Sequence, residues 1–230
     1  MHVLEDLGSL TPTAQAFLRR AWVEPSMDAR LSTDFKTVVD RTGKRVAAPL
    51  ELVLRREGFA ARFGGLRYDV RRSVRVGDQR FDSVRRWQFD LVETMRAEWG
   101  GWSFGWYGEC VSSPVSYLVH CDGRVGVSGG GPFLEAWSSL HHMIEDHTLV
   151  DELADWEPVS LSSLEDWTPL SVENKQLREV MDALTPVTEA SGSCTRWWRS
   201  EDVAVRRSHG WTSTRPRPIG TMIWSRTGRI

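Results

Sequence analysis

Cysteine is scarce in this chain of 230 residues. Its three cysteines, Cys110, Cys121 and Cys194, are odd in number and far apart. This spacing excludes a disulfide framework and a Cys-x-x-Cys zinc pattern. Because unpaired thiols suit a reducing compartment, we expect a cytoplasmic protein.

Long apolar runs are also missing. The chain has no stretch of about 18 apolar residues, the length that a membrane-spanning helix needs. Residues 1–6 have neither a basic region nor an apolar core, so they lack the pattern of a signal peptide. We therefore expect no membrane partner.

Lysine is nearly absent, and the charge is unevenly distributed. Arginine supplies all but three of the 29 basic residues, a usage typical of GC-rich bacterial genomes. The net charge is only −2, but residues 135–189 hold thirteen acidic side chains against two basic ones, whereas residues 195–230 are basic. A basic field over the whole protein is therefore missing, and nucleic acid is not expected as a partner. We expect the basic segment to fold back on the acidic one.

Hydrophobic periodicity predicts helices first, then a run of strands, then helices again. We expect helices over residues 11–23, 49–63, 133–152 and 172–184, and strands over residues 66–71, 86–91, 102–106, 115–119, 124–127, 203–205 and 221–224.

Glycine marks the expected chain reversals. Gly64-Gly65 should end the second helix, with one of the two in the left-handed conformation. Asp122-Gly123 is typical of a two-residue type I′ hairpin turn. The glycines at 129–131 should reverse the chain from a strand into a helix.

Because the strands do not alternate with helices, the order predicts the α+β class. We expect an antiparallel sheet of about five strands with helices packed on one face. This domain should span residues 1–155, and a C-terminal extension, residues 156–230, should pack on it.

Two segments resemble the SUKH superfamily. One is a helix that ends in Phe63-Gly64-Gly65-Leu66, and the other runs from Tyr117 to Leu149 through a hairpin, a glycine-rich loop and a helix. The resemblance covers roughly residues 49–153. It implies an α+β fold without shared catalytic residues, and a role as an immunity protein against a bacterial toxin.

Patterns for catalysis and metal binding are weak. Residues 141–147 hold three histidines, but His142 and His147 are five apart and point to different sides of a helix. We therefore expect an ion-paired helix, with no metal, no cofactor and no catalytic residue. Cys194 has no nearby base in the sequence. Gly129, Gly130 and Gly131 are candidates for contact with an anion at the start of the expected helix.

The twelve tryptophans suggest binding. Trp99, Trp102, Trp106 and Tyr107 alternate with glycines, which fits either a sheet face covered by helices or an exposed aromatic patch for a partner. These four residues, with Glu145 and Asp146, are our candidates for binding a partner or a ligand.

Together these patterns favour a non-enzymatic, tryptophan-rich binding protein. The leading hypothesis is an immunity protein that occludes a bacterial toxin domain, with acidic residues that face a basic partner. The alternative is an enzyme or small-ligand-binding protein of a biosynthetic cluster, with a pocket between the sheet, the glycine-rich loop and the C-terminal extension.

Overall fold

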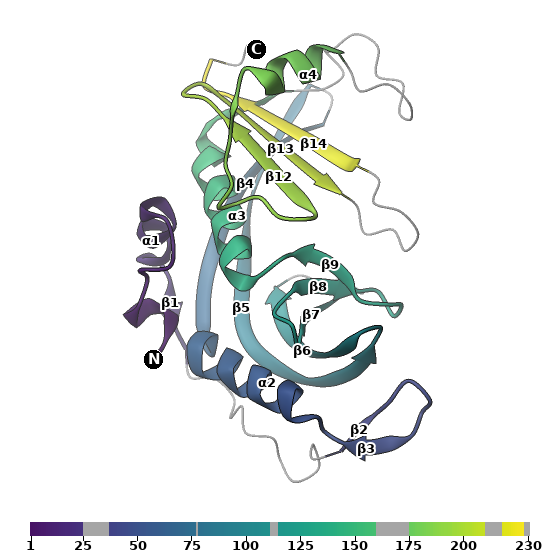
Figure 1. Cartoon of the computed structure of the whole chain (residues 1–230). Coiled ribbons are helices and arrows are strands. Elements are labelled where there is room, and N and C mark those ends of the chain that lie inside the picture. The colour runs from purple at the N-terminus through teal and green to yellow at the C-terminus, as the bar shows by residue number, and fades with distance from the viewer. Residues whose placement is uncertain (25–36, 77, 111–114, 160–174, 210–217, 228–230) are drawn as a thin grey trace. The chain divides into compact units, whose positions relative to one another are not determined.

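The chain forms two compact units (Figure 1). Unit 1 contains residues 1–69 and 85–143, and unit 2 contains residues 70–84 and 144–230. Unit 2 thus takes in more than the expected C-terminal extension. The structure is a computed structural model, which describes all residues except 25–36, 77, 111–114, 160–174, 210–217 and 228–230.

A seven-stranded curled sheet (Figure 1) has the strand order β1-β4-β5-β6-β7-β8-β9. Most of it belongs to unit 1, whereas its residues between 70 and 84 belong to unit 2. The strands are β1 (Trp22–Val23), β4 (Leu66–Val76), β5 (Gln79–Glu98), β6 (Gly101–Glu109), β7 (Ser116–His120), β8 (Val125–Ser128) and β9 (Leu134–Trp137). Consecutive strands β4 to β8 form the expected meander, and the structure combines helices with mostly antiparallel strands. The number of sheets differs from the prediction: the described residues form three sheets instead of one.

Helix α2 (Leu50–Phe63) packs on this sheet through its apolar side. The ring of Phe59 lies 5.6 Å from Phe104 and 5.9 Å from Trp106, and all three side chains are buried. As expected, the helix ends at the glycine pair, where Gly65 has a φ of 77°. The helix therefore follows from local signals, namely an apolar stripe and a glycine stop.

Helix α1 (Pro12–Leu18) is shorter than predicted. Thr11 caps it by accepting a hydrogen bond from Ala14 N at 3.2 Å. Residues 22–23, which we expected in the helix, instead form β1 and pair with the edge of β4. Pairing with the sheet outweighs the helical pattern there.

The third predicted helix also begins later than expected. Residues 134–137 form β9 and pair with β8, and helix α3 (Leu140–Glu152) starts only after Ser139, whose Oγ accepts a hydrogen bond from His142 N at 3.1 Å. The glycines at 129–131 connect two strands and do not precede a helix. The anion contact proposed for them therefore loses its physical basis.

The β7–β8 hairpin forms where expected, but with a different turn. Val119 pairs with Val125, and Gly123 N donates to His120 O at 2.9 Å. The loop thus has three residues, with Cys121 and Asp122 at the centre of the turn and Gly123 after it at a φ of 101°. A tight turn followed by a left-handed residue replaces the predicted type I′ turn.

A small hairpin and a short helix complete the described part of unit 1. Strands β2 (Thr37–Val39) and β3 (Arg45–Ala47) pair with each other, and η1 (Val3–Glu5) lies near the N-terminus. At the turn of the hairpin, Asp40 Oδ1 accepts hydrogen bonds from the backbone of Thr42 and Lys44.

Unit 2 contains a five-stranded antiparallel sheet of order β10-β14-β13-β12-β11. Its elements are η3 (Leu153–Asp155), β10 (Glu157–Val159), α4 (Lys175–Asp182), β11 (Thr185–Pro186), β12 (Thr195–Arg199), β13 (Val203–His209) and β14 (Pro218–Ser225). Ala204 pairs with Trp224, and Val205 pairs with Ile223. The two C-terminal segments predicted as strands are therefore confirmed, and they pair with each other.

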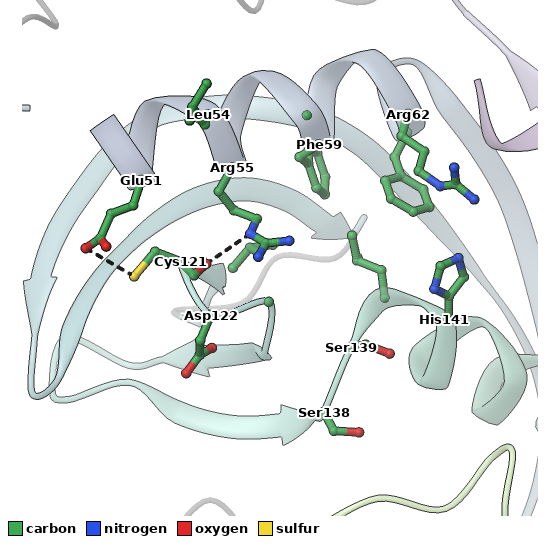
Figure 2. Close-up of a pocket in the computed structure, with 15 residues that line it drawn as sticks. Glu51, Leu54, Arg55, Phe59, Arg62, Cys121, Asp122, Ser138, Ser139 and His141 are labelled. Carbon is green, nitrogen blue, oxygen red and sulfur yellow. Dashed lines mark hydrogen bonds between the residues drawn. The ribbon is translucent and has the colours of Figure 1, made fainter. Parts of the chain in front are cut away.

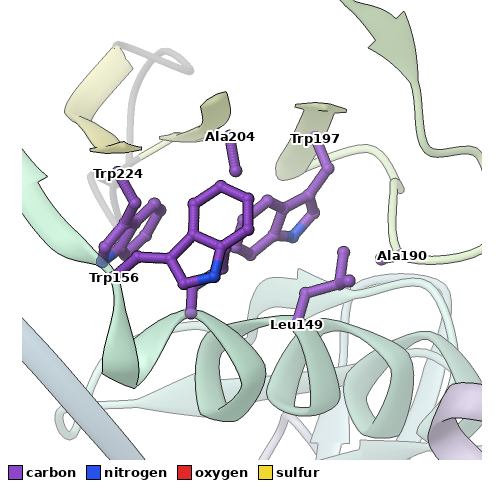
Figure 3. Packing of buried hydrophobic residues seen from close by; sticks show 7 residues of the cluster. Leu149, Trp156, Ala190, Trp197, Ala204 and Trp224 are labelled. Carbon is purple, nitrogen blue, oxygen red and sulfur yellow. The ribbon is translucent and has the colours of Figure 1, made fainter. Parts of the chain in front are cut away.

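Tryptophans of this sheet pack on the part of α3 that belongs to unit 2 (Figure 3). The rings of Trp197 and Trp224 stack at 5.6 Å and are 1% and 2% exposed. They share a cluster with Leu149, Leu153 and Trp156. Residues 195–209 and 218–227 are thus ordered against the acidic helix, as predicted, whereas Trp211 lies outside the described residues.

Candidate functional site

Unit 1 contains a pocket of about 650 Å³ (Figure 2). Three segments line it: the side of α2 from Glu51 to Phe63, the β7–β8 hairpin at residues 119–123, and residues 138–141 at the start of α3. Its volume is within the range of about 300–1,000 Å³ that is usual for ligand sites.

Apolar side chains and one glycine shape the inner wall. Phe59, Phe63 and Val119 line the pocket and are buried. Gly58 lies in the middle of α2, and a Cβ added there would meet no atom within 4 Å. Glycine normally weakens a helix, but here it leaves open space on the side that faces the pocket.

At one end of the pocket, Cys121 connects the β7–β8 hairpin with α2. Arg55 Nε donates a hydrogen bond to Cys121 O at 3.0 Å, and the Cys121 thiol donates to Glu51 Oε1 at 3.8 Å. The same sulfur accepts a hydrogen bond from Trp102 N at 3.4 Å. These contacts tie the hairpin to α2 and give the thiol a structural role.

Asp122 keeps its negative charge at this end. Burial by itself would raise its pKa, but hydrogen bonds from the backbone and side chain of Arg124 and from His120 outweigh that effect and lower the pKa. His120 Nδ1 lies 2.9 Å from Asp122 Oδ1. With Glu51, Asp122 therefore supplies a second carboxylate beside Arg55.

The opposite end of the pocket holds one arginine and one histidine. Arg62 and His141 both line it, one from α2 and the other from α3, and Figure 2 places their side chains on the same side of the pocket. His141 Nε2 is 3.3 Å from Ser9 Oγ, and its ring meets Phe63 edge to face at 6.3 Å. The Nε of Arg62 is buried and has no hydrogen-bond partner among the described residues.

The two serines that line the pocket are engaged in local structure. Ser139 Oγ caps α3, and Ser138 Oγ makes a short contact with His142 Nδ1. These contacts position the first turn of α3 at the wall of the pocket. His141, which belongs to this turn, lines the pocket.

Of the predicted aromatic candidates, two are exposed. Trp99 is 78% exposed at the turn between β5 and β6, and Tyr107 is 54% exposed on β6. Trp106 belongs to the core, and Trp102 is half-buried. The Arg41 guanidinium lies 3.5 Å from the centre of the Trp99 ring, an arrangement that suits a cation–π contact.

The predicted acidic candidates are buried in unit 2. Asp146 is 1% exposed, accepts a hydrogen bond from Trp197 Nε1 at 2.8 Å, and binds Arg206 through both oxygens at 2.9 Å. Glu145 is also buried. Asp146 is therefore occupied inside the unit. Within the described ranges, no three potential metal ligands gather in one place.

Sequence reasoning missed most of the pocket. It singled out the segment that contains His141, but it did not connect it with Arg55, Arg62 or the hairpin. One signal was available: Arg55 and Arg62 are seven residues apart, so they lie on the same side of the predicted helix. The partners contributed by residues 119–123 and 138–141 had no such signal.

Comparisons of the chain with protein-family models, with curated proteins and with solved structures found no match. Among the described residues, no helix has the length and apolar character needed to cross a membrane.

Proposed function

We propose that this chain is a non-enzymatic binding protein that acts as an immunity protein and occludes a bacterial toxin domain. The observation that carries the proposal is the exposure of Trp99, which is the most exposed aromatic ring among the described residues. Tryptophan and arginine are the residues most enriched at the energetic centres of protein interfaces. Trp99 and Arg41 place one residue of each type side by side on the same surface.

The shape of the turn supports this role for Trp99. Glu98 pairs with Gly101, so Trp99 and Gly100 form the tip of the β5–β6 hairpin. Gly100 has a φ of 82°, which allows the tight reversal that presents the ring. A ring fixed on a hairpin loses little conformational entropy when it enters a partner's pocket.

The state of the nucleophilic side chains favours binding over catalysis. The Cys121 thiol contacts Glu51 and a backbone amide, and the Ser139 hydroxyl caps a helix. Each group thus has a structural task, which supports a non-enzymatic role.

Charge mimicry contributes less than the sequence suggested. Several acids of the segment 135–189 pair with arginines of unit 2, among them Asp146 with Arg206 and Glu152 with Arg199. Carboxylates neutralised in this way offer little field to a basic partner. The proposed interface therefore centres on Trp99.

The test combines genetics with one substitution. The proposal expects a toxin gene beside the gene for this chain, and expects the chain to bind the encoded toxin domain. Trp99→Ala should weaken that binding about tenfold or more. The matched control Leu50→Ala, which removes another exposed apolar side chain of unit 1, should leave it unchanged. A neighbouring biosynthetic cluster, or full binding by Trp99→Ala, would contradict the proposal.

The pocket favours a second candidate, a small-ligand-binding protein. It offers apolar walls and convergent polar groups, which is the usual make-up of a ligand site. It lies between α2, the β7–β8 hairpin and the start of α3, and not beside the glycine-rich loop and the C-terminal extension as expected.

A further inference from the structure

The pocket in unit 1 is electrically polarised. Its end at the β7–β8 hairpin holds two carboxylates, Glu51 and Asp122, beside the guanidinium of Arg55, and Asp122 is also paired with Arg124 at 2.8 Å. Its other end holds Arg62 and His141, and the lining residues include no carboxylate besides Glu51 and Asp122. The arginines at the first end balance its carboxylates, so a negatively charged group would be attracted mainly at the second end, where Arg62 has no carboxylate beside it among the lining residues.

Arg62 has hydrogen-bonding capacity that the described residues do not use. Its Nε is buried and has no hydrogen-bond partner among the described residues, and no carboxylate besides Glu51 and Asp122 lines the pocket. A buried donor without an acceptor is costly, and arginine presents its donors as a planar fork. An oxyanion with two oxygens in one plane matches that fork.

The walls between the two ends are suited to an apolar body. Phe59, Phe63, Val119 and Leu140 line this stretch, and Gly58 leaves space beside them. Leu54 adds an exposed apolar side chain at the rim. The volume of about 650 Å³ exceeds what a bare inorganic ion requires.

We propose that this pocket binds an amphiphilic organic anion, with its carboxylate or phosphate at Arg62 and His141 and its apolar body along Phe59 and Val119. The inference rests on the second candidate function, ligand binding, and is independent of the partner surface at Trp99. It names the ligand class: an organic acid with an apolar body.

Isothermal titration calorimetry of the full chain tests this with four probes kept below their micelle concentrations. They are decanoate, decyl phosphate, decanol and inorganic phosphate. At least one of the two amphiphilic anions should bind at least about tenfold more tightly than decanol, and inorganic phosphate should bind more weakly than that anion. The ratio between decanoate and decyl phosphate identifies the headgroup. Equal affinity for decanol and the anions, or no binding of either anion, would overturn the inference.

Variants locate the site. Arg62→Gln should weaken binding of the anion at least about tenfold and leave decanol unchanged, because one charge-assisted hydrogen-bond pair is removed. Arg45→Gln removes an exposed arginine of unit 1 that does not line the pocket, and it should change neither affinity. Gly58→Leu should abolish binding of both probes by filling the pocket. Anion binding that survives Arg62→Gln or Gly58→Leu would overturn the assignment.

Two controls distinguish loss of ligand binding from loss of folding and from loss of toxin binding. Thermal melting of each variant verifies folding, and Gly58→Leu is expected to fold because a Cβ at that position meets no neighbour. Trp99→Ala should retain the full affinity for the anion, so loss of toxin binding in that variant tests the partner surface alone.

Discussion

Asp146 is almost completely buried in unit 2, and its charge is balanced by Arg206. Asp146→Ala leaves this arginine without its partner in a poorly hydrated site, so we expect a loss of about 3–5 kcal/mol in the free energy of unfolding. Urea denaturation measures it. Asp155→Ala is the control, because the Asp155 side chain is 72% exposed in its pair with Arg71 and should contribute about 1 kcal/mol or less. Equal losses would contradict the buried role of Asp146.

The neighbouring residue His147 should make stability depend on pH. Burial lowers its pKa to about 3; the charge of Asp146 opposes this shift, and those of Arg72 and Arg206 add to it. Since the unfolded chain binds this proton near pH 6.5 and the folded chain does not, stability is lost as the pH falls from 6.5 toward 3, by about 1.4 kcal/mol per unit. The difference between the unfolding curves of wild type and His147→Gln, measured from pH 7 to 4, should have this slope. A flat difference would mean that His147 binds its proton equally well in the folded and the unfolded chain, which would contradict the lowered pKa.

Gly65 and Gly43 allow two effects of a glycine-to-alanine substitution to be compared, namely backbone strain alone and backbone strain with a steric clash. Both have a positive φ, 77° and 83°, but a Cβ at Gly65 would lie 2.1 Å from Glu24 O, whereas one at Gly43 would meet nothing within 4 Å. Gly43→Ala should therefore cost only the conformational strain, about 1 kcal/mol, and Gly65→Ala clearly more. Their melting temperatures provide the comparison, and an equal decrease would exclude the clash.

At the scale of elements, short-range signals were sufficient for some features. Helix α2 and its glycine stop, the meander from β4 to β8, and the pairing of β13 with β14 followed from periodicity and turn residues. The start of α3 could not be predicted in this way. Leu134, Glu135 and Ala136 favour a helix by their intrinsic propensity, and residues 134–137 form a strand because the edge of β8 was available for pairing.

Strand β13 should be the most protected part of the C-terminal segment. It pairs with β12 on one side and β14 on the other, and Ala204 and Val205 are fully buried. Trypsin should therefore cut after Arg206 much more slowly than after Arg41, which is exposed at the β2–β3 turn. Moderate salt should change this little, because burial of Trp197 and Trp224 outweighs surface ion pairs. Rapid release of peptides from residues 195–209 would indicate a free basic arm.

At the scale of the molecule, the pocket could not be predicted because its parts are distant in the sequence. Residues 51–63, 119–123 and 138–141 meet only after the sheet has curled. The tryptophans were easier to interpret, since four large aromatic side chains in residues 195–230 predict burial whatever their partners are. Composition thus indicated that the segment packs, and only the structure identified Leu149 and Asp146 as contacts.

The division into units predicts the behaviour of a fragment. A chain of residues 1–155 keeps Leu149 and Leu153 but loses Trp197 and Trp224, which cover them. This fragment should therefore expose an apolar surface, bind a hydrophobic dye and aggregate on mild heating. The full chain is the control. A monomeric fragment with native-like near-ultraviolet dichroism would mean that residues 144–155 do not need the C-terminal sheet.

The stacking of Trp197 on Trp224 also has a consequence for biosynthesis. The apolar side of α3 is translated early, yet the last ring that covers it is added 68 residues after Trp156. At about 5–20 residues per second, the nascent chain carries this surface unshielded for roughly 3–14 seconds. During that interval, ribosome-associated chaperones or neighbouring nascent chains can bind the exposed cluster. Slow codons between β12 and β14 would lengthen the exposure, so the yield of folded protein should be sensitive to synonymous changes there.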